Sequence, residues 1–151
     1  MVEKYTVEDS DKLYRWLHPG QFKWDEGRPT SAAFKDPYLS IDIECLTSLQ
    51  ESYERAQKRG KNAVASISVE QAYQKAQKVV HCPTQVLSES PEKSVCQDEH
   101  DCPAFDKTVP ADKLTCINAA HGCVVGKKTS SISKFFSKTC AVEIYPPEVS
   151  V

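Results

Sequence analysis

The sequence has no apolar run long enough to cross a membrane. A transmembrane helix needs about 20 consecutive apolar residues, and the best candidate here is the short segment AVASI at 63–67. The first residues, MVEKYTVEDSDK, are charged and lack the apolar centre of a secretory signal. We therefore expect a cytoplasmic protein without a membrane segment.

The chain also lacks an excess of one charge. It carries 19 Lys and Arg residues against 21 Asp and Glu residues, which gives a formal net charge of −2. Proteins that neutralise phosphates along a nucleic acid carry a basic surface. Nucleic acid is therefore not expected to be the main partner, although a local basic patch remains compatible with this charge.

Cysteine is one residue type that the chain does not lack. There are seven cysteines, an odd number, and no export signal that would place them in an oxidising compartment. We therefore expect reduced thiols in a cytosol and no disulfide framework. A bound metal is the competing use for some of these thiols.

The patterning predicts a single α+β domain over residues 1–151. Ser48 with Glu51, and Ser68 with Gln71, form the S-x-x-E/Q pattern that caps the start of a helix. Residues 11–19 fit either a short helix or a short strand. Periodicity predicts helices over 49–59, 69–77 and 130–139, and strands over 30–34, 38–45, 62–68, 78–82, 116–125 and 141–145. We expect a mixed sheet of about five strands with about three helices.

Residues 83–115 break this order. Four prolines interrupt an acidic, serine-containing stretch that has no sustained periodicity. The segment is predicted to be one long irregular insertion in the domain. Because such a loop is unusual inside a compact domain, we expect it to be functional, mobile or held by a bound group.

Four potential metal ligands lie in or beside this insertion: Cys82, Cys96, His100 and Cys102. The Cys96-x3-His100 spacing occurs in structural zinc sites, and a metal would explain how the loop is held. However, His100-x-Cys102 is too short for an ordinary C-x2-C knuckle, and a second paired knuckle is missing. Zinc is therefore a hypothesis at this site, and free thiols are the favoured interpretation.

A second candidate site lies in the segment GKKTSS at 126–131, where the last predicted helix begins. The segment is one residue short of a Walker A loop. Lysines oppose the dipole at a helix N-terminus, so an anion bound by free N–H groups, Lys127, Lys128 and Thr129 would explain their presence. The alternative is that both lysines extend into water.

Three further polar residues are candidates for the same ligand. Arg15 and His18 lie on either side of a predicted turn and could form a polar cluster with His121. His121 shares a strand face with apolar neighbours, which favours a hydrogen-bonded core histidine over a catalytic one. No complete catalytic constellation is visible, so an enzyme is not the favoured interpretation.

Two blocks of the sequence, RPTSAAFKDPYLSIDI at 28–43 and INAAHGCVVGKKTSSISKFF at 117–136, resemble small uncharacterised bacterial proteins. Those proteins carry an R-P-S-S-A-A-F…L-S-V-D block early and an N-P-A-H-A…V-x-G block late. Here Ala119 stands where the pattern has proline. The resemblance implies a prokaryotic protein, in some cases encoded beside toxin or antiviral defence genes. It implies no mechanism, because the group has no established activity.

Two functions from different classes follow. The first is a non-catalytic cytosolic accessory protein that binds a partner protein, with 83–116 as a contact surface. The second is a small enzyme or sensor for a phosphate-bearing ligand such as a nucleotide, which would use Arg15, His18, His121 and Lys127. The first is favoured at this stage because the sequence shows no complete catalytic set.

Overall fold

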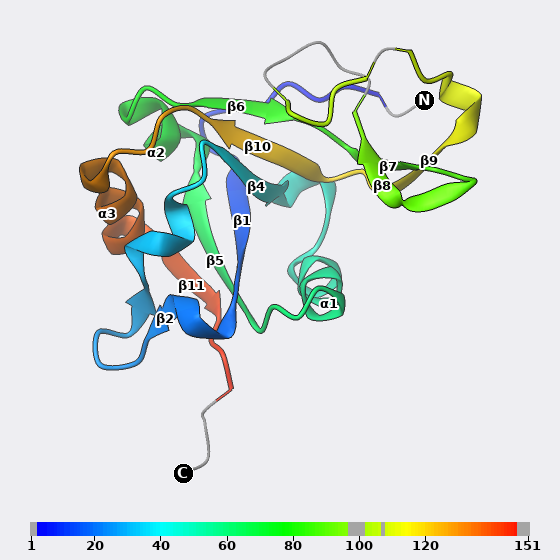
Figure 1. Ribbon diagram of the computed structural model, residues 1–151. Helices are drawn as coiled ribbons and strands as arrows, with labels where there is room; N and C mark the ends of the chain where they lie inside the picture. The colour runs from blue at the N-terminus through cyan, green and yellow to red at the C-terminus, as the bar shows by residue number, and fades with distance from the viewer. Residues whose placement is uncertain (1–2, 97–101, 107, 148–151) are drawn as a thin grey trace.

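Six strands form the main sheet of the computed structural model, which describes residues 3–96, 102–106 and 108–147 (Figure 1). Their order is β11-β5-β1-β4-β10-β6, and all these pairs are antiparallel. In chain order the strands are β1 (Lys12–Leu17), β4 (Tyr38–Ile43), β5 (Ala63–Ser68), β6 (Lys78–His81), β10 (His121–Val125) and β11 (Ala141–Ile144). The predicted α+β fold is thus confirmed, with an antiparallel main sheet that has one strand more than expected.

Three α-helices in the described residues pack on the two faces of this sheet: α1 (Leu49–Lys58), α2 (Val69–Gln74) and α3 (Ser130–Thr139). α2 and α3 lie on one face and α1 lies on the other (Figure 1). The predicted caps are present, since the hydroxyls of Ser48 and Ser68 accept the N–H groups of Glu51 and Gln71 at 3.1 and 3.0 Å. α2 ends earlier than predicted because Ala76 adopts a positive φ of 57°. None of the helices in this part of the chain has the length and apolar character needed to cross a bilayer.

The hydrophobic core lies between the main sheet and the helices α2 and α3. Phe34 and Phe136 are fully buried there, with ring centroids 5.9 Å apart. The predicted strand over 30–34 is wrong, because Ser31–Phe34 forms a short 3-10 helix. Ala33 and Phe34 are consecutive and both completely buried, whereas consecutive residues of a strand point to opposite faces.

A second, smaller sheet occupies much of the segment that the sequence predicted to be irregular. It contains β7 (Thr84–Leu87), β8 (Ser90–Val95) and β9 (Leu114–Asn118) in the order β8-β7-β9. The prediction of an irregular loop over 83–115 is therefore wrong for these strands. Prolines are tolerated because Pro83 precedes β7 and Pro91 lies in the edge strand β8, where a ladder N–H is not needed.

We call residues 83–96, 102–106 and 108–118 the lobe. A short 3-10 helix, Ala111–Lys113, leads into its strand β9. The remaining strands, β2 (Phe22–Lys23) and β3 (Arg28–Pro29), form a two-stranded ribbon near the other end of the molecule (Figure 1). The lobe and α1 lie on the side of the main sheet opposite α2 and α3 (Figure 1), and both contribute residues to one cavity.

Candidate functional site

A cavity of about 830 Å³ opens on the sheet face that carries α1. Its volume falls within the range of about 300–1,000 Å³ that is typical of small-molecule sites. The charged and imidazole groups that line it are Arg15, His18, Asp36, Asp42, Arg55, Lys58, Arg59, Lys61 and His121. Five Lys and Arg residues thus face two Asp residues, so the cavity is basic although the chain has a net charge of −2.

Arg15 lies where the main sheet opens. β1 pairs with β4 over two residue pairs, whereas its pairing with β5 runs along the whole strand. The Arg15 side chain bridges the opening: its Nε donates to the carbonyl of Ala33 at 2.9 Å and its Nη1 to the carbonyl of Ser40 at 3.2 Å. Burial lowers the pKa of Arg15, and Asp36 opposes that shift. Two main-chain carbonyls therefore hold this guanidinium in the cavity wall. Among the described residues, no carboxylate forms an ion pair with it.

His18 and Lys61 meet at the rim of the cavity. The Lys61 Nζ atom lies 2.7 Å from Nε2 of His18, so a neutral imidazole can accept a hydrogen bond from the ammonium. Burial, Lys61 and Arg15 lower the pKa of His18, and burial, Arg15 and Arg59 lower the pKa of Lys61. Like charges therefore crowd this rim, and each disfavours the protonation of its neighbours.

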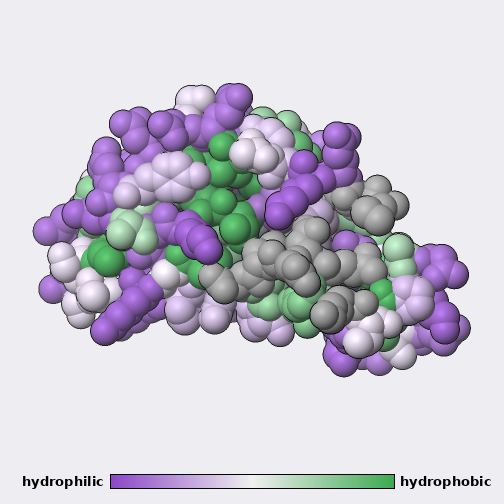
Figure 2. Space-filling view, turned by 90° about the horizontal axis from the view of Figure 1, so that it is seen from above, coloured by the Kyte–Doolittle hydropathy of each residue, from purple (hydrophilic) through white to green (hydrophobic). Residues whose placement is uncertain are grey.

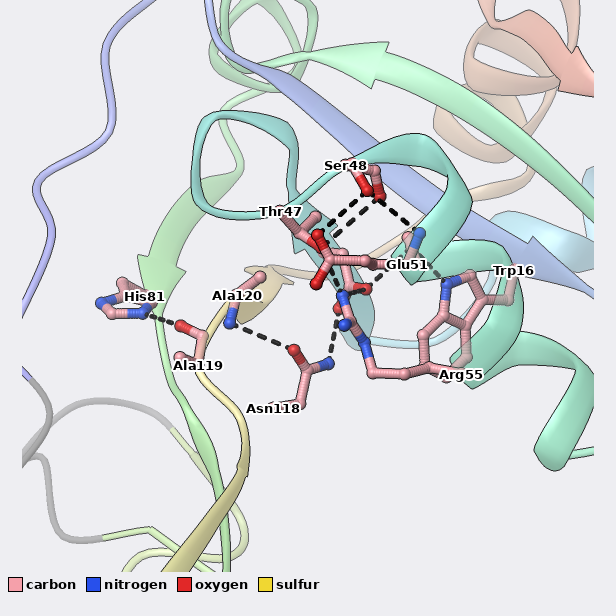
Figure 3. A network of polar contacts seen from close by, with 11 residues as sticks. Trp16, Thr47, Ser48, Glu51, Arg55, His81, Asn118, Ala119 and Ala120 are labelled. Carbon is pink, nitrogen blue, oxygen red and sulfur yellow. Dashed lines mark hydrogen bonds and ion pairs between the residues drawn. The ribbon is translucent and has the colours of Figure 1, made fainter.

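Asp42 is a buried carboxylate beneath α1, only 1% exposed. Its Oδ2 accepts hydrogen bonds from Ser52 Oγ and Arg55 Nη2, and its Oδ1 accepts one from Asn118 Nδ2, all at 2.8 Å. The Trp16 indole N–H donates to Ser52 Oγ at 2.9 Å. Figure 3 shows Trp16, Arg55 and Asn118 converging on this network from separate elements. The network joins α1 and the end of β9 to the main sheet.

Three cysteine thiols meet at the wall that the lobe contributes to the cavity. The Sγ atom of Cys82 lies 3.0 Å from that of Cys96 and 3.4 Å from that of Cys102, and all three lie within 4.8 Å of one another. Three of the four predicted metal ligands are thus brought together, and the fourth, His100, lies outside the described residues. Hydrogen bonding to Cys96 and burial raise the pKa of Cys82, so this thiol keeps its proton at neutral pH unless a cation displaces it.

His121 faces the same cavity from β10. Its Nδ1 lies 2.7 Å from the carbonyl oxygen of Cys82, so this nitrogen donates and Nε2 is the acceptor. Burial lowers the pKa of His121. The ring is partly buried at the edge of the core, and it lines the cavity together with Arg15 and His18. The three residues proposed as a polar cluster therefore share one cavity.

Lys127, Lys128 and Thr129 are not among the described residues that line the cavity, although Lys128 interacts electrostatically with Asp36, Cys123 and Arg15. Thr129 caps α3, where its side chain accepts an N–H of the first turn at 3.2 Å. The Lys128 ammonium donates to the carbonyls of Val124 and Gly126 at 2.9 and 3.0 Å, and Lys127 is exposed. Carbonyl oxygens therefore stabilise the charge of Lys128. No bound anion is needed to explain a lysine at this helix N-terminus.

Replacing Lys128 by glutamate is expected to lower the free energy of unfolding by about 1–2 kcal/mol, because a carboxylate would then face the carbonyls that accept from the ammonium. Lys127→Glu is the matched control, since this neighbouring side chain is exposed and its replacement should change stability by less than about 0.5 kcal/mol. Urea denaturation of both variants measures the difference. Equal stabilities would show that the carbonyl contacts of Lys128 contribute nothing.

Sequence reasoning missed most of the basic rim. Lys58, Arg59 and Lys61 belong to the run KRGK at 58–61, which was interpreted only as the end of a helix. Asp42 was missed because alternation assigned it to the polar side of a half-buried strand, and α1 covers that side. The basic run at the end of the predicted helix over 49–59 was the feature of the sequence that could have predicted a basic cavity rim.

Comparisons with models of protein families, with curated proteins and with solved structures gave no match for this chain. The resemblance of the two sequence blocks to small bacterial proteins therefore stays a prediction.

Proposed function

We propose that the protein binds a phosphate-bearing small molecule, such as a nucleotide, in the basic cavity. The observation that carries this proposal is the set of three cations at the rim, Lys58, Arg59 and Lys61. None of them forms an ion pair with a carboxylate in the part of the chain that the structure describes. By contrast, Arg55 is paired with Asp42 at 2.8 Å.

An anion among these groups would remove an unfavourable arrangement of charge. Besides burial, which is the largest cause, Arg15 and Arg59 lower the pKa of Lys61, and Lys61 lowers that of His18. An opposite charge within about 4–6 Å favours the charged forms, so a bound phosphate would shift both pKa values back up. The guanidinium of Arg59 also offers the planar fork that binds phosphate oxygens in pairs.

The size and lining of the cavity favour a phosphate attached to an organic group. At about 830 Å³ the cavity has room for more than an inorganic anion. Trp16, Tyr38 and Ile117 contribute apolar and aromatic surface, and Tyr38 is 39% exposed. An aromatic side chain of this kind can stack on a planar base.

The other function considered, an accessory protein that binds a partner protein, stays a prediction. It relied on an irregular segment over 83–116 as a contact surface, and much of that segment forms a sheet whose residues contribute one wall of the cavity. The proposal here is for binding alone. A general-base role for the free Nε2 of His121 would require a reacting group that the geometry does not identify.

Differential scanning fluorimetry with ATP, AMP, pyrophosphate and adenosine tests the proposal. ATP and pyrophosphate should raise the melting temperature, and adenosine should not, because the rim binds through charge. Arg59→Glu should weaken binding about tenfold or more, since it reverses a charge beside the ligand. Lys134→Glu is the control, because Lys134 is an exposed lysine of α3 outside the cavity lining.

Three results would overturn the proposal. One is a melting temperature that no phosphate-bearing compound changes at millimolar concentration. A second is an equal loss of affinity in Arg59→Glu and Lys134→Glu, which would indicate a nonspecific response to net charge. Stabilisation by adenosine alone would also contradict it, because the base and not the phosphate would then be recognised.

A further inference from the structure

The three clustered thiols come from separate segments of the chain. Cys82 follows β6 of the main sheet, Cys96 follows β8 of the lobe, and Cys102 begins the segment that returns to β8. In a tetrahedral zinc site with Zn–S bonds of about 2.3 Å, the sulfur atoms are about 3.8 Å apart. The Cys82–Cys96 and Cys82–Cys102 Sγ separations of 3.0 and 3.4 Å are shorter than this value by about 0.4–0.8 Å, and all three atoms lie within 4.8 Å of one another. Small side-chain rotations would therefore admit one ion.

Backbone hydrogen bonds join Cys96 to the segment that follows Cys102, through a β-bridge between Cys96 and Phe105. The N–H of Cys96 donates to the carbonyl of Ala104 at 2.8 Å, and the N–H of Asp106 donates to the carbonyl of Cys96 at 2.7 Å. The N–H of Phe105 donates to the carbonyl of Cys102 at 3.1 Å. These backbone bonds hold Cys102 beside Cys96, and hydrogen bonds around metal ligands orient them in metal sites.

The lobe has little hydrophobic core of its own. Val86, Val95 and Pro83 are the buried aliphatic side chains among its described residues. In the view from above, hydrophilic residues cover most of the lobe, at the right-hand end of the molecule (Figure 2). Small sheets with so few buried side chains are marginally stable in water and commonly depend on a disulfide or a metal.

From these observations we propose that Cys82, Cys96 and Cys102 bind one Zn²⁺ ion as thiolates and that this ion holds the lobe against the main sheet. On binding, each of the three S–H groups releases its proton to solvent and a Zn–S bond forms, without transfer of electrons. The fourth tetrahedral position is available to Cys123, which lines the same cavity, or to water. This inference does not depend on what the cavity binds.

Metal analysis of the full chain, purified under reducing conditions without chelator, tests the proposal. We expect about one zinc ion per chain, and we expect Co²⁺ in its place to give thiolate-to-metal charge-transfer absorption. Less than about a tenth of an equivalent, both as purified and after zinc is added to the reduced protein, would overturn the proposal. A Cys82–Cys96 disulfide found by mass spectrometry in such metal-free protein would overturn it equally.

Cysteine variants identify the ligands. Cys82→Ser, Cys96→Ser and Cys102→Ser should each lose the cobalt absorption, whereas Cys116→Ser, at an exposed thiol of β9 in the same lobe, should retain it. Loss of the absorption in Cys116→Ser to the same extent would contradict the assignment. If a ligand variant fails to fold, the metal content of the parent protein still decides the question.

Chelation provides an independent readout of the structural role. Removal of zinc should allow trypsin to cut the lobe at Lys93 and Lys113, both exposed, before it cuts at Lys58 in α1. Equal rates of cleavage in the lobe with and without zinc would show that the ion does not hold the lobe.

Discussion

Replacing Asp42 by alanine is expected to lower the free energy of unfolding by about 3–5 kcal/mol, because it removes one partner of a buried ion pair. The carboxylate accepts hydrogen bonds from Ser52, Arg55 and Asn118, all at 2.8 Å. Without it, the Arg55 guanidinium and the Asn118 amide lose their common acceptor beneath α1. Urea denaturation followed by circular dichroism measures the loss.

Two variants control this result. Asp25→Ala removes an exposed carboxylate from the turn between β2 and β3 and should change stability by less than about 0.5 kcal/mol. Asp42→Asn keeps the shape but replaces one acceptor by a donor, so its loss should be intermediate. Equal unfolding midpoints for Asp42→Ala and Asp25→Ala would show that the network does not anchor α1.

The second large effect is expected at Gly122 in β10. A Cβ atom there would lie 2.6 Å from the backbone oxygen of Val80, and 3.2 and 3.3 Å from the Cδ1 atoms of Ile41 and Ile43. A carbonyl in a paired strand cannot rotate away, so β6 and β10 would have to separate. We expect Gly122→Ala to lower the free energy of unfolding by about 3 kcal/mol, as overpacking of a core does.

The same substitution should also affect the thiol cluster. The N–H of Cys82 donates to the carbonyl of His121 at 2.9 Å, directly beside Gly122. Separation of the strands would move Cys82, and we expect the zinc content to fall together with the stability. Gly20→Ala is the control, since a Cβ atom at Gly20 would have no neighbour within 4 Å and the φ of this residue is not in the left-handed region. An unfolding midpoint for Gly122→Ala equal to that of Gly20→Ala would refute the steric argument.

Local signals predicted two of the three described helices to within one residue. The predicted helix over 130–139 matches α3 (Ser130–Thr139), and the predicted helix over 49–59 differs from α1 by one residue. Both depend on a capping hydroxyl and a periodicity of 3.6 residues, which neighbouring residues determine by themselves. The strand over 38–45 was recognisable for the same reason, because its alternation is local.

The lobe was not predictable in this way. β7 and β9 pair although Gln85 and Cys116 are far apart in the sequence, and β8 carries four exposed residues among its six. Such strands have no apolar alternation of their own and depend on pairing with distant segments. The scattered prolines were interpreted as breaks, although an edge strand accommodates Pro91.

By itself, the sequence determined which chemical groups were available. It identified Cys82, Cys96 and Cys102 as possible metal ligands, and Arg15, His18 and His121 as a possible polar cluster. Only the tertiary structure decided which of these groups meet. The antiparallel order β1-β4-β10-β6 brings the cluster residues to one cavity, adds the basic run at 58–61 to its rim, and leaves the lysines before α3 outside it. The physical reason is that proximity of side chains across a sheet depends on strand order and register, which are set by long-range pairing and packing and not by neighbouring residues.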